Sequence, residues 1–285
     1  MVLLLKLISF VLSKLSPAGL ERLAKGMTFL VWDILRIRRA LILKNLDIAF
    51  HQEKTAEERL SIGRQSIFHF VMTILEFLSE RNGQLGRHVS IAEGEKHLKA
   101  AMDEGRGAYI LCIHMGNWEA MGSGLTKAGY PSHVIVKKVG SEAIDDFVRQ
   151  RRHENGFFCI RRQKKGDAVK GIRQVLKNGG LVGFVMDQAR PGEPALPFFG
   201  QPAKTNTSFA AILGKIPAPV IPAYIRRTGV HQHEIHIKEA LKLSYSDSAH
   251  ATDIQQQSEY FNSVVESMIR ECPEQYFWMH NRWKH

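Results

Sequence analysis

The sequence predicts an α/β protein, with a mostly parallel mixed sheet, helices on both faces, and a helical section before it. Two observations lead to this prediction. From about residue 86 onward, short apolar runs alternate with longer amphipathic segments, as in strands joined by crossover helices. Before that point the apolar residues recur at helical spacing. Because no repeat or low-complexity linker divides the chain, we expect one domain over residues 1–285: an anchoring helix at 1–15, a helical section at 16–85 and an α/β body at 86–285.

The first 15 residues, MVLLLKLISFVLSKL, are strongly apolar. A membrane-spanning helix needs about 20 consecutive apolar residues, and two lysines interrupt this run. A secretory signal would carry its positive charge first and a cleavage site of small residues afterwards, and neither is present. On a helix, Lys6, Ser9 and Ser13 form one narrow polar stripe, which is typical of a helix lying in the membrane interface. A core helix with a thin solvent-facing stripe is the alternative.

Helix-start signals follow. Ser16 and Pro17 fit the N-cap and the first helical position, and Thr55 with Glu58 forms a capping box that opens a long helix ending near residue 80. In the α/β body, strands are expected at about 108–113, 133–136, 157–160, 181–185, 219–225 and 234–238. Helices are expected at about 94–103, 118–128, 142–153, 167–177, 206–214 and 255–270.

Composition limits the function classes. Hydrophobic residues make up 44% of the chain, which is typical of a globular protein, and the net charge of +11 indicates an anionic partner. The segment from Lys137 to Arg173 contains 11 basic residues and 5 acidic ones. No helix-turn-helix, aromatic RNA-binding motif or basic repeat favours nucleic acid. The three cysteines form no Cys-x-x-Cys pair, which indicates a reducing compartment and argues against a zinc site.

The most informative stretch runs from residue 109 to 119. An apolar strand leads into a polar turn that carries His114, and a helix with Glu119 in its first turn follows. Five residues correspond to about 140° of α-helix, so the two side chains meet only if His114 ends the strand. A histidine oriented by a carboxylate is a general base, and free N–H groups of the helix N-terminus can hold an oxyanion. We therefore predict an acyl-transfer site. His88 and Glu93 have the same spacing without the strand-to-turn context, and about one such pair is expected by chance from 13 His and 28 acidic residues.

The stretch His-Met-Gly-Asn-Trp-Glu resembles the His-x4-Asp/Glu motif of glycerolipid acyltransferases. More narrowly, it is similar to that of the late acyltransferases of lipid A biosynthesis in Gram-negative bacteria. Met-Asp-Gln at 186–188, Pro-Phe-Phe-Gly at 197–200 with Lys-Thr at 204–205, and the stretch 273–283 also fit that family. The resemblance extends from about residue 12 to 283 and implies a glycerol-3-phosphate acyltransferase-like fold.

The resemblance implies an O-acyltransferase at the cytoplasmic face of the inner membrane. The donor would be an acyl carrier protein thioester and the acceptor a hydroxyl of a lipid A precursor or similar glycolipid, with no cofactor or metal. His114 would deprotonate the hydroxyl and Glu119 would orient the imidazole. Both partners are anionic and suit the basic segment.

Substrate-binding roles are expected for five further residues: Asn117, Arg152, Asp187, Gly200 and Lys204. Arg152 stands in the family's Arg-x-x-x-Gly pattern, with Arg149 and Arg151 as outer basic residues. Asp187 ends a strand and is expected to orient Arg152 or a substrate hydroxyl. The loop at 191–205 is either a binding loop, with Phe198 and Phe199 available to a ligand, or a rigid loop with both rings buried. The C-terminal aromatics fit either a membrane interface or a packed final strand.

Three alternatives remain open. The acceptor could be another lyso-lipid or aminolipid. The chain could be a non-enzymatic basic protein that binds membrane surfaces. Metal-dependent hydrolysis could use His231, His233 and His236, although no acidic partner stands out near them and no Gly-x-Ser-x-Gly motif supports a hydrolase.

Overall fold

The computed structural model describes residues 2–80, 84–136, 138, 140–161, 166–243 and 251–284. Within these residues a seven-stranded sheet has the order β1-β9-β8-β2-β5-β3-β4. Its strands are β1 (Val89–Glu93), β2 (Ala108–Cys112), β3 (Ser132–Val136), β4 (Phe158–Arg161), β5 (Leu181–Val185), β8 (Val220–Gly229) and β9 (Gln232–Ile237). Neighbouring strands are parallel except for β8 and β9, which are antiparallel. The predicted α/β fold with a mostly parallel mixed sheet is confirmed.

Helices cover both faces of this sheet. The helices of the body are α5 (Glu95–Asp103), α6 (Trp118–Lys127), α7 (Glu142–Glu154), α8 (Asp167–Lys177), α9 (Ser208–Leu213) and α10 (Ala251–Glu271). Alternate side chains of the central strand β2 point to opposite faces, as the pleat requires. Tyr109 and Leu111 join the core beneath α8, α9 and α10, whereas Ile110 and Cys112 join the core beneath α5 and α6.

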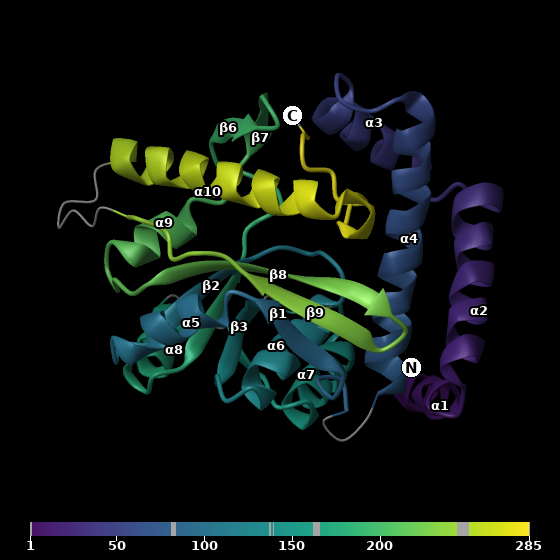
Figure 1. Ribbon diagram of the computed structural model, residues 1–285, viewed down its shortest axis with the longest axis horizontal. Coiled ribbons are helices and arrows are strands. Elements are labelled where there is room, and N and C mark those ends of the chain that lie inside the picture. Colours follow the sequence, from purple (N-terminus) through teal and green to yellow (C-terminus); the bar gives the residue numbers. More distant parts are fainter. Residues whose placement is uncertain are drawn as a thin grey trace.

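The N-terminal section is helical, as expected. It contains α1 (Val2–Leu12), α2 (Pro17–Thr28), the π-helix η1 (Phe29–Ile34), α3 (Arg39–Phe50) and α4 (Ala56–Ser79). The long helix α4 stands at the side of the sheet, with α2 packed along its outer side (Figure 1). The Ser16 side chain caps α2 by accepting from the Gly19 N–H, and Thr55 and Glu58 form the predicted capping box.

The helix α1 is not a core helix. Ser9 and Leu12 are buried against the protein, while Leu3, Leu7 and Phe10 are exposed, Leu3 by 81%. The core-helix alternative is therefore wrong, and the apolar residues face outward. No helix among the described residues combines the length and the apolar character needed to cross a bilayer.

Two segments differ from expectation. The loop at 191–205 contains a separate hairpin of β6 (Ala195–Phe198) and β7 (Gln201–Lys204), and Phe198 and Phe199 are both buried in it. The binding-loop reading of these rings is wrong, because they pack against each other and against Trp283. The C-terminal segment forms no strand within residues 273–284, the part that the structure describes. It has one 3-10 turn, η2 (Pro273–Gln275), and a single bridge from Tyr276 to Met115.

Candidate active site

A cavity of about 560 Å³ lies against β3 and β5 and extends to His114 and Gln188 beyond the carboxyl ends of β2 and β5. The pairing of β3 with β5 runs from Ser132 to Val134 of β3, and among the described residues it does not continue towards the carboxyl ends of the two strands. The cavity lies beside this region, and its lining is largely apolar, with His114, Glu119 and Arg152 among the polar exceptions. An apolar cavity with a few convergent polar groups is the usual form of a small-molecule site. It is also the position expected for ligands of a parallel sheet.

His114 follows the end of β2 and contacts Asp187, which follows the end of the neighbouring strand β5. Its Nδ1 lies 2.8 Å from Asp187 Oδ1, and its backbone N–H donates to Oδ2 over 2.9 Å. Asp187 is 1% exposed, and both of its oxygens hold the same residue. Parallel strands end at one edge of a sheet, so this pair meets although 73 residues separate it in sequence.

The electrostatics of the pair follow from this contact. Burial alone would lower the pKa of His114, but the Asp187 carboxylate outweighs it and raises that pKa above 6.5. Burial alone would raise the pKa of Asp187, and the charge and hydrogen bonds of His114 lower it instead. With Nδ1 donating to Asp187, Nε2 is the nitrogen that can accept a proton.

Glu119 does not orient His114, so this part of the expectation is wrong. Its two carboxylate oxygens accept from Arg152, from Nε over 2.8 Å and from the terminal nitrogen over 2.6 Å. Such bidentate pairing fixes both side chains. Glu119 lies in the first turn of α6, which places its carboxylate against α7 rather than against the Nδ1 side of the imidazole. Arg152 is bound by Glu119 and His114 is bound by Asp187. The expectation that Asp187 orients Arg152 is therefore wrong.

The three neighbouring arginines of α7 have different surroundings. Arg152 lines the cavity, and its pKa is raised by Glu119 although burial opposes this. Arg149 forms ion pairs with Asp145 and Asp146. Arg151 is not an outer residue, because it is 6% exposed and donates over 2.6 Å to the Glu80 carbonyl beyond the end of α4. Residues 137, 139 and 162–165 of the basic segment lie outside the described residues.

The structure separates the remaining predicted site residues from the cavity. Asn117 is fully buried: its Oδ1 caps α6 by accepting from Ala120, and its Nδ2 donates to Glu76. Gly200 lies at the turn of the β6–β7 hairpin and lines a different hollow beside α3. The backbone carbonyl of Lys204 accepts from Arg282 over 2.6 Å. None of Asn117, Gly200 and Lys204 is among the described residues that line the cavity of His114.

Sequence reasoning missed an aromatic group around the imidazole. The ring centroid of Trp118 lies 5.1 Å from that of His114, edge to face, and the ring of Phe277 lies 6.0 Å away. Phe277 also donates its backbone N–H to the His114 carbonyl over 2.9 Å. Both residues belong to the stretches that carry the family resemblance, which was the available signal. Tyr276, Trp278 and Trp283 are buried, so these rings do not form a membrane-interface group.

The three histidines of the metal alternative do have acidic partners, contrary to expectation. His231 pairs with Glu80, His233 with Glu76 and His236 with Glu93. Within the described part of the chain, no group of three or more His, Cys, Asp or Glu side chains is arranged to hold a metal ion.

The sequence matches known proteins over nearly its full length. The family model described as bacterial lipid A biosynthesis acyltransferase matches residues 2–285. The chain is 24% identical over 259 residues to the lipid A biosynthesis palmitoleoyltransferase of Escherichia coli strain K12, covering 88% of this chain and 80% of that protein. It is 22% identical over 274 residues to the lipid A biosynthesis lauroyltransferase of the same strain, covering 92% and 84%. A lipid A biosynthesis acyltransferase of Haemophilus influenzae is 24% identical over 191 residues, which cover 65% of this chain and 56% of that protein.

Proposed function

This chain belongs to the bacterial lipid A biosynthesis acyltransferases and is an acyltransferase. From this membership and from the geometry of the site, we propose the following substrates and place of action. It moves a fatty acyl group from an acyl carrier protein thioester to a hydroxyl of a lipid A precursor or similar glycolipid. The reaction takes place at the cytoplasmic face of the inner membrane. The observation that supports this most is the pair of His114 and Asp187 beside a largely apolar cavity.

In the proposed reaction, His114 acts as the general base through Nε2. It takes the proton of the acceptor hydroxyl while the hydroxyl oxygen attacks the thioester carbonyl carbon. A C–O bond forms, the C–S bond then breaks, and the leaving thiolate receives the proton from the imidazolium. Asp187 keeps the proton on Nδ1 and stabilises the imidazolium that forms. No nucleophilic serine or cysteine is required.

Arg152 and Glu119 have a different role in this proposal. The guanidinium lies in the cavity wall, where a positive charge favours the negative charge that develops on the carbonyl oxygen. Glu119 holds the guanidinium by two hydrogen bonds, so it remains in place without reorganising during the reaction. The apolar walls of the cavity, which include Ile135, Phe184 and Val185, would take the acyl chain.

The charge and the N-terminal helices support the proposed partners. An acidic carrier protein and a phosphorylated glycolipid are both attracted to a chain of net charge +11. The N-terminal helices α1, α2 and η1 expose a set of large apolar side chains, namely Leu3, Leu4, Leu7, Phe10, Val11, Leu23, Met27, Phe29, Leu30 and Ile34. Lys6 and Lys14 are exposed among them. Apolar side chains interspersed with lysines suit the surface of an anionic membrane.

The proposed base is tested by two matched histidine variants. His114→Ala should lower turnover by about 10²–10⁴-fold, which is typical for loss of a general base. His88 has the same His-x4-Glu spacing but is exposed, so the turnover of His88→Ala should equal that of the wild type. The measurement is product formation by mass spectrometry from acyl carrier thioesters with lipid A precursors and with lyso-lipids. Equal losses in both variants would remove His114 from the role of base, and product with lyso-lipids alone would change the acceptor.

A further inference from the structure

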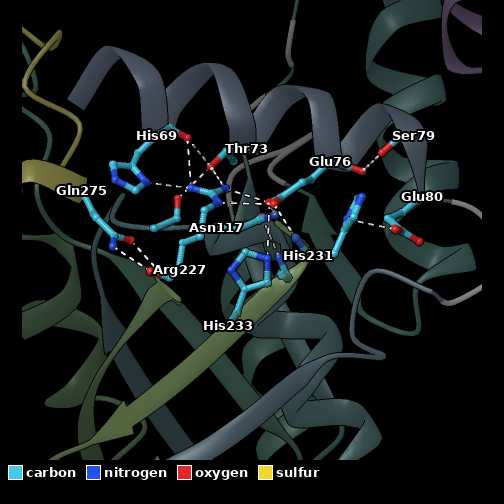
Figure 2. A network of polar contacts seen from close by, with 12 residues as sticks. His69, Thr73, Glu76, Ser79, Glu80, Asn117, Arg227, His231, His233 and Gln275 are labelled. Atoms are coloured by element: carbon cyan, nitrogen blue, oxygen red, sulfur yellow. Dashed lines mark hydrogen bonds and ion pairs between the residues drawn. The ribbon is translucent and has the colours of Figure 1, made fainter. Parts of the chain in front are cut away.

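A buried carboxylate lies behind the active-site turn. Glu76 is in α4, is fully buried, and accepts hydrogen bonds from several directions (Figure 2). Arg227 of β8 donates two of them, over 3.2 and 2.7 Å, and Asn117 Nδ2 donates another over 2.7 Å. The backbone N–H of His231 donates over 2.9 Å, and His233 Nε2 lies 3.3 Å away.

The central ion pair of this group joins the carboxylate of Glu76 to the guanidinium of Arg227. Burial alone would raise the pKa of Glu76, but Arg227 and His233 hold it well below its usual range. Burial lowers the pKa of His69 to about 3, so its ring is neutral near pH 7, and burial lowers the pKa of His233 as well. Compared with apolar packing of the same volume, a buried ion pair gives little net stability. The main effect of the Glu76–Arg227 pair is therefore expected on the geometry of the residues that it contacts.

Three links run from this group to the turn between His114 and Glu119. The first is Asn117, whose Nδ2 donates to Glu76 (Figure 2). Its Oδ1 caps α6 by accepting from the Ala120 N–H. The second is Thr73 of α4, whose hydroxyl donates to the Gly116 carbonyl over 2.7 Å. The third is Gln275, whose carbonyl accepts from the Gly116 N–H over 3.1 Å.

The turn also packs directly on the strand that carries Arg227. Gly116 has a φ of +57°, and a Cβ at this position would lie 2.2 Å from the Ile225 carbonyl oxygen. The side chain of Gln275 exchanges two hydrogen bonds with the backbone of Arg227, over 2.7 and 2.9 Å. The turn is thus held from behind by α4, β8 and η2 together.

We infer that Glu76 is a positioning residue for acyl transfer: through Asn117 it fixes the N-terminus of α6, so that Glu119 meets Arg152 in the cavity wall. This inference rests on the function proposed above. Glu76 is not among the described residues that line the cavity, and its hydrogen bond with Asn117 is its direct contact with the turn. Because reacting groups displaced by about 1 Å can lose about 10²-fold in rate, a contact behind the turn affects turnover.

The contact between residues 76 and 117 can be reversed in polarity, which gives a test by rescue. Asn117→Asp keeps an oxygen to cap α6 but places a second carboxylate against Glu76. Glu76→Gln supplies an amide at the other side. In the double variant the amide at position 76 donates to the carboxylate at position 117, and the total charge is that of the wild type. At least one carboxylate, at position 76 or 117, remains in each of these variants except Glu76→Gln alone.

The experiment compares kcat and KM of the wild type, both single variants and the double variant in the same acyl-transfer assay. Asn117→Asp should lower kcat by about 10²-fold with KM changed by less than about threefold, and the double variant should recover most of this loss. Should Asn117→Asp fail to fold, Asn117→Ser replaces it, because serine keeps an N-cap and loses the contact with Glu76. The matched control is Asn262→Asp, since Asn262 is also buried and hydrogen-bonded but lies under the β6–β7 hairpin. Its kcat should equal that of the wild type.

A second readout does not depend on activity. Hydrogen exchange of the peptide covering 116–121 should be faster in Asn117→Asp, or in its serine replacement, and should return to the wild-type rate in the double variant. If the wild type transfers no acyl group, the proposed function fails, and exchange alone then decides whether Glu76 holds the turn. The inference is overturned by wild-type kcat and exchange in the single variants, by a double variant no better than the worse single one, or by an equal kcat loss in Asn262→Asp.

Discussion

At the scale of residues, the partner of His114 determines which nitrogen can act. Asp187 takes the Nδ1 side, so Nε2 is the nitrogen that acts as the base in the proposed reaction. The same carboxylate raises the pKa of His114, which increases its basicity but leaves more of it protonated at low pH. The acid side of the pH profile therefore reports on Asp187 as well as on His114.

Replacing Asp187 by Asn should move the acid limb of kcat/KM to lower pH. Only the neutral imidazole accepts a proton, so wild-type activity rises as the pH passes upward through a His114 pKa above 6.5. Without the carboxylate, burial lowers that pKa, and the limb shifts downward. The plateau of kcat should also fall, by about 10²-fold, because the imidazole loses the acceptor that orients it. A pH–rate series of both proteins measures this, and an unchanged or upward-shifted limb would contradict the assignment.

The arginines of α7 allow a second test at this scale. Arg152→Gln should lower kcat by about 10²-fold, since it removes the positive charge of the cavity wall and leaves Glu119 without its partner. Arg149→Gln should retain kcat, because Arg149 pairs with acidic residues of its own helix. Steady-state kinetics compares the two variants. A kcat defect in Arg149→Gln alone would mean that the wrong arginine had been assigned.

At the scale of elements, the N-terminal helices combine two tasks. The inner side of α4 carries Thr73, which donates to the Gly116 carbonyl, and Glu76, which accepts from Asn117. The outer helices α1, α2 and η1 expose apolar side chains. Since α2 packs on α4, a membrane surface bound by the outer helices would lie close to the element that supports the site.

Membrane binding should depend on α2 and η1 as well as on α1. Full burial of one leucine is worth about 1.5–3 kcal/mol, so replacing three exposed residues by Gln should weaken vesicle binding at least about tenfold even when insertion is partial. Leu3, Leu7 and Val11 form one such set, and Leu23, Leu30 and Ile34 form another. Co-sedimentation with anionic vesicles measures binding, and Tyr260→Gln on α10 is the control. Unchanged binding in both triple variants would place the contact elsewhere.

At the scale of the whole molecule, the C-terminal segment joins the helical section to the α/β body. Asn45 of α3 donates to the carbonyls of Trp278 and His280, over 2.9 and 2.7 Å. Trp278 is 1% exposed and packs edge to face on Phe50, while Phe277 reaches His114. One continuous core includes Leu12 near the start of the chain and Trp283 near its end.

Trp278→Ala should therefore destabilise the whole protein rather than one part of it. Truncation of a buried large side chain costs about 3–5 kcal/mol, a large part of the stability of a domain. Tyr260→Ala removes a ring that is 42% exposed, so its loss of stability should be much smaller. Denaturant unfolding of the three proteins gives the comparison. A loss in Trp278→Ala no larger than that in Tyr260→Ala would contradict this role of the C-terminal segment.

Much of the secondary structure was predictable because its signals are local. The six predicted strands and the helices between them agree with the structure to within a few residues, and both helix caps lie where expected. The strand β1 and the β6–β7 hairpin were missed, because β1 is mostly exposed and has little apolar periodicity, and prolines occur in both hairpin strands. Periodicity and caps involve residues three or four positions apart, so the sequence alone determined them.

The site itself was only partly predictable. The strand-to-turn context predicted His114 as a candidate, and the sequence stretches around Arg152 and Asp187 predicted both of those residues; the structure brings the three close to one cavity. Which carboxylate meets the imidazole was decided by the order of the strands, because β2 and β5 are neighbours although 73 residues separate His114 from Asp187. The burial of Asn117 against Glu76 depends in the same way on where α4 packs. Local interactions determine the elements of this protein, whereas contacts between distant segments determine the partner of each charged group.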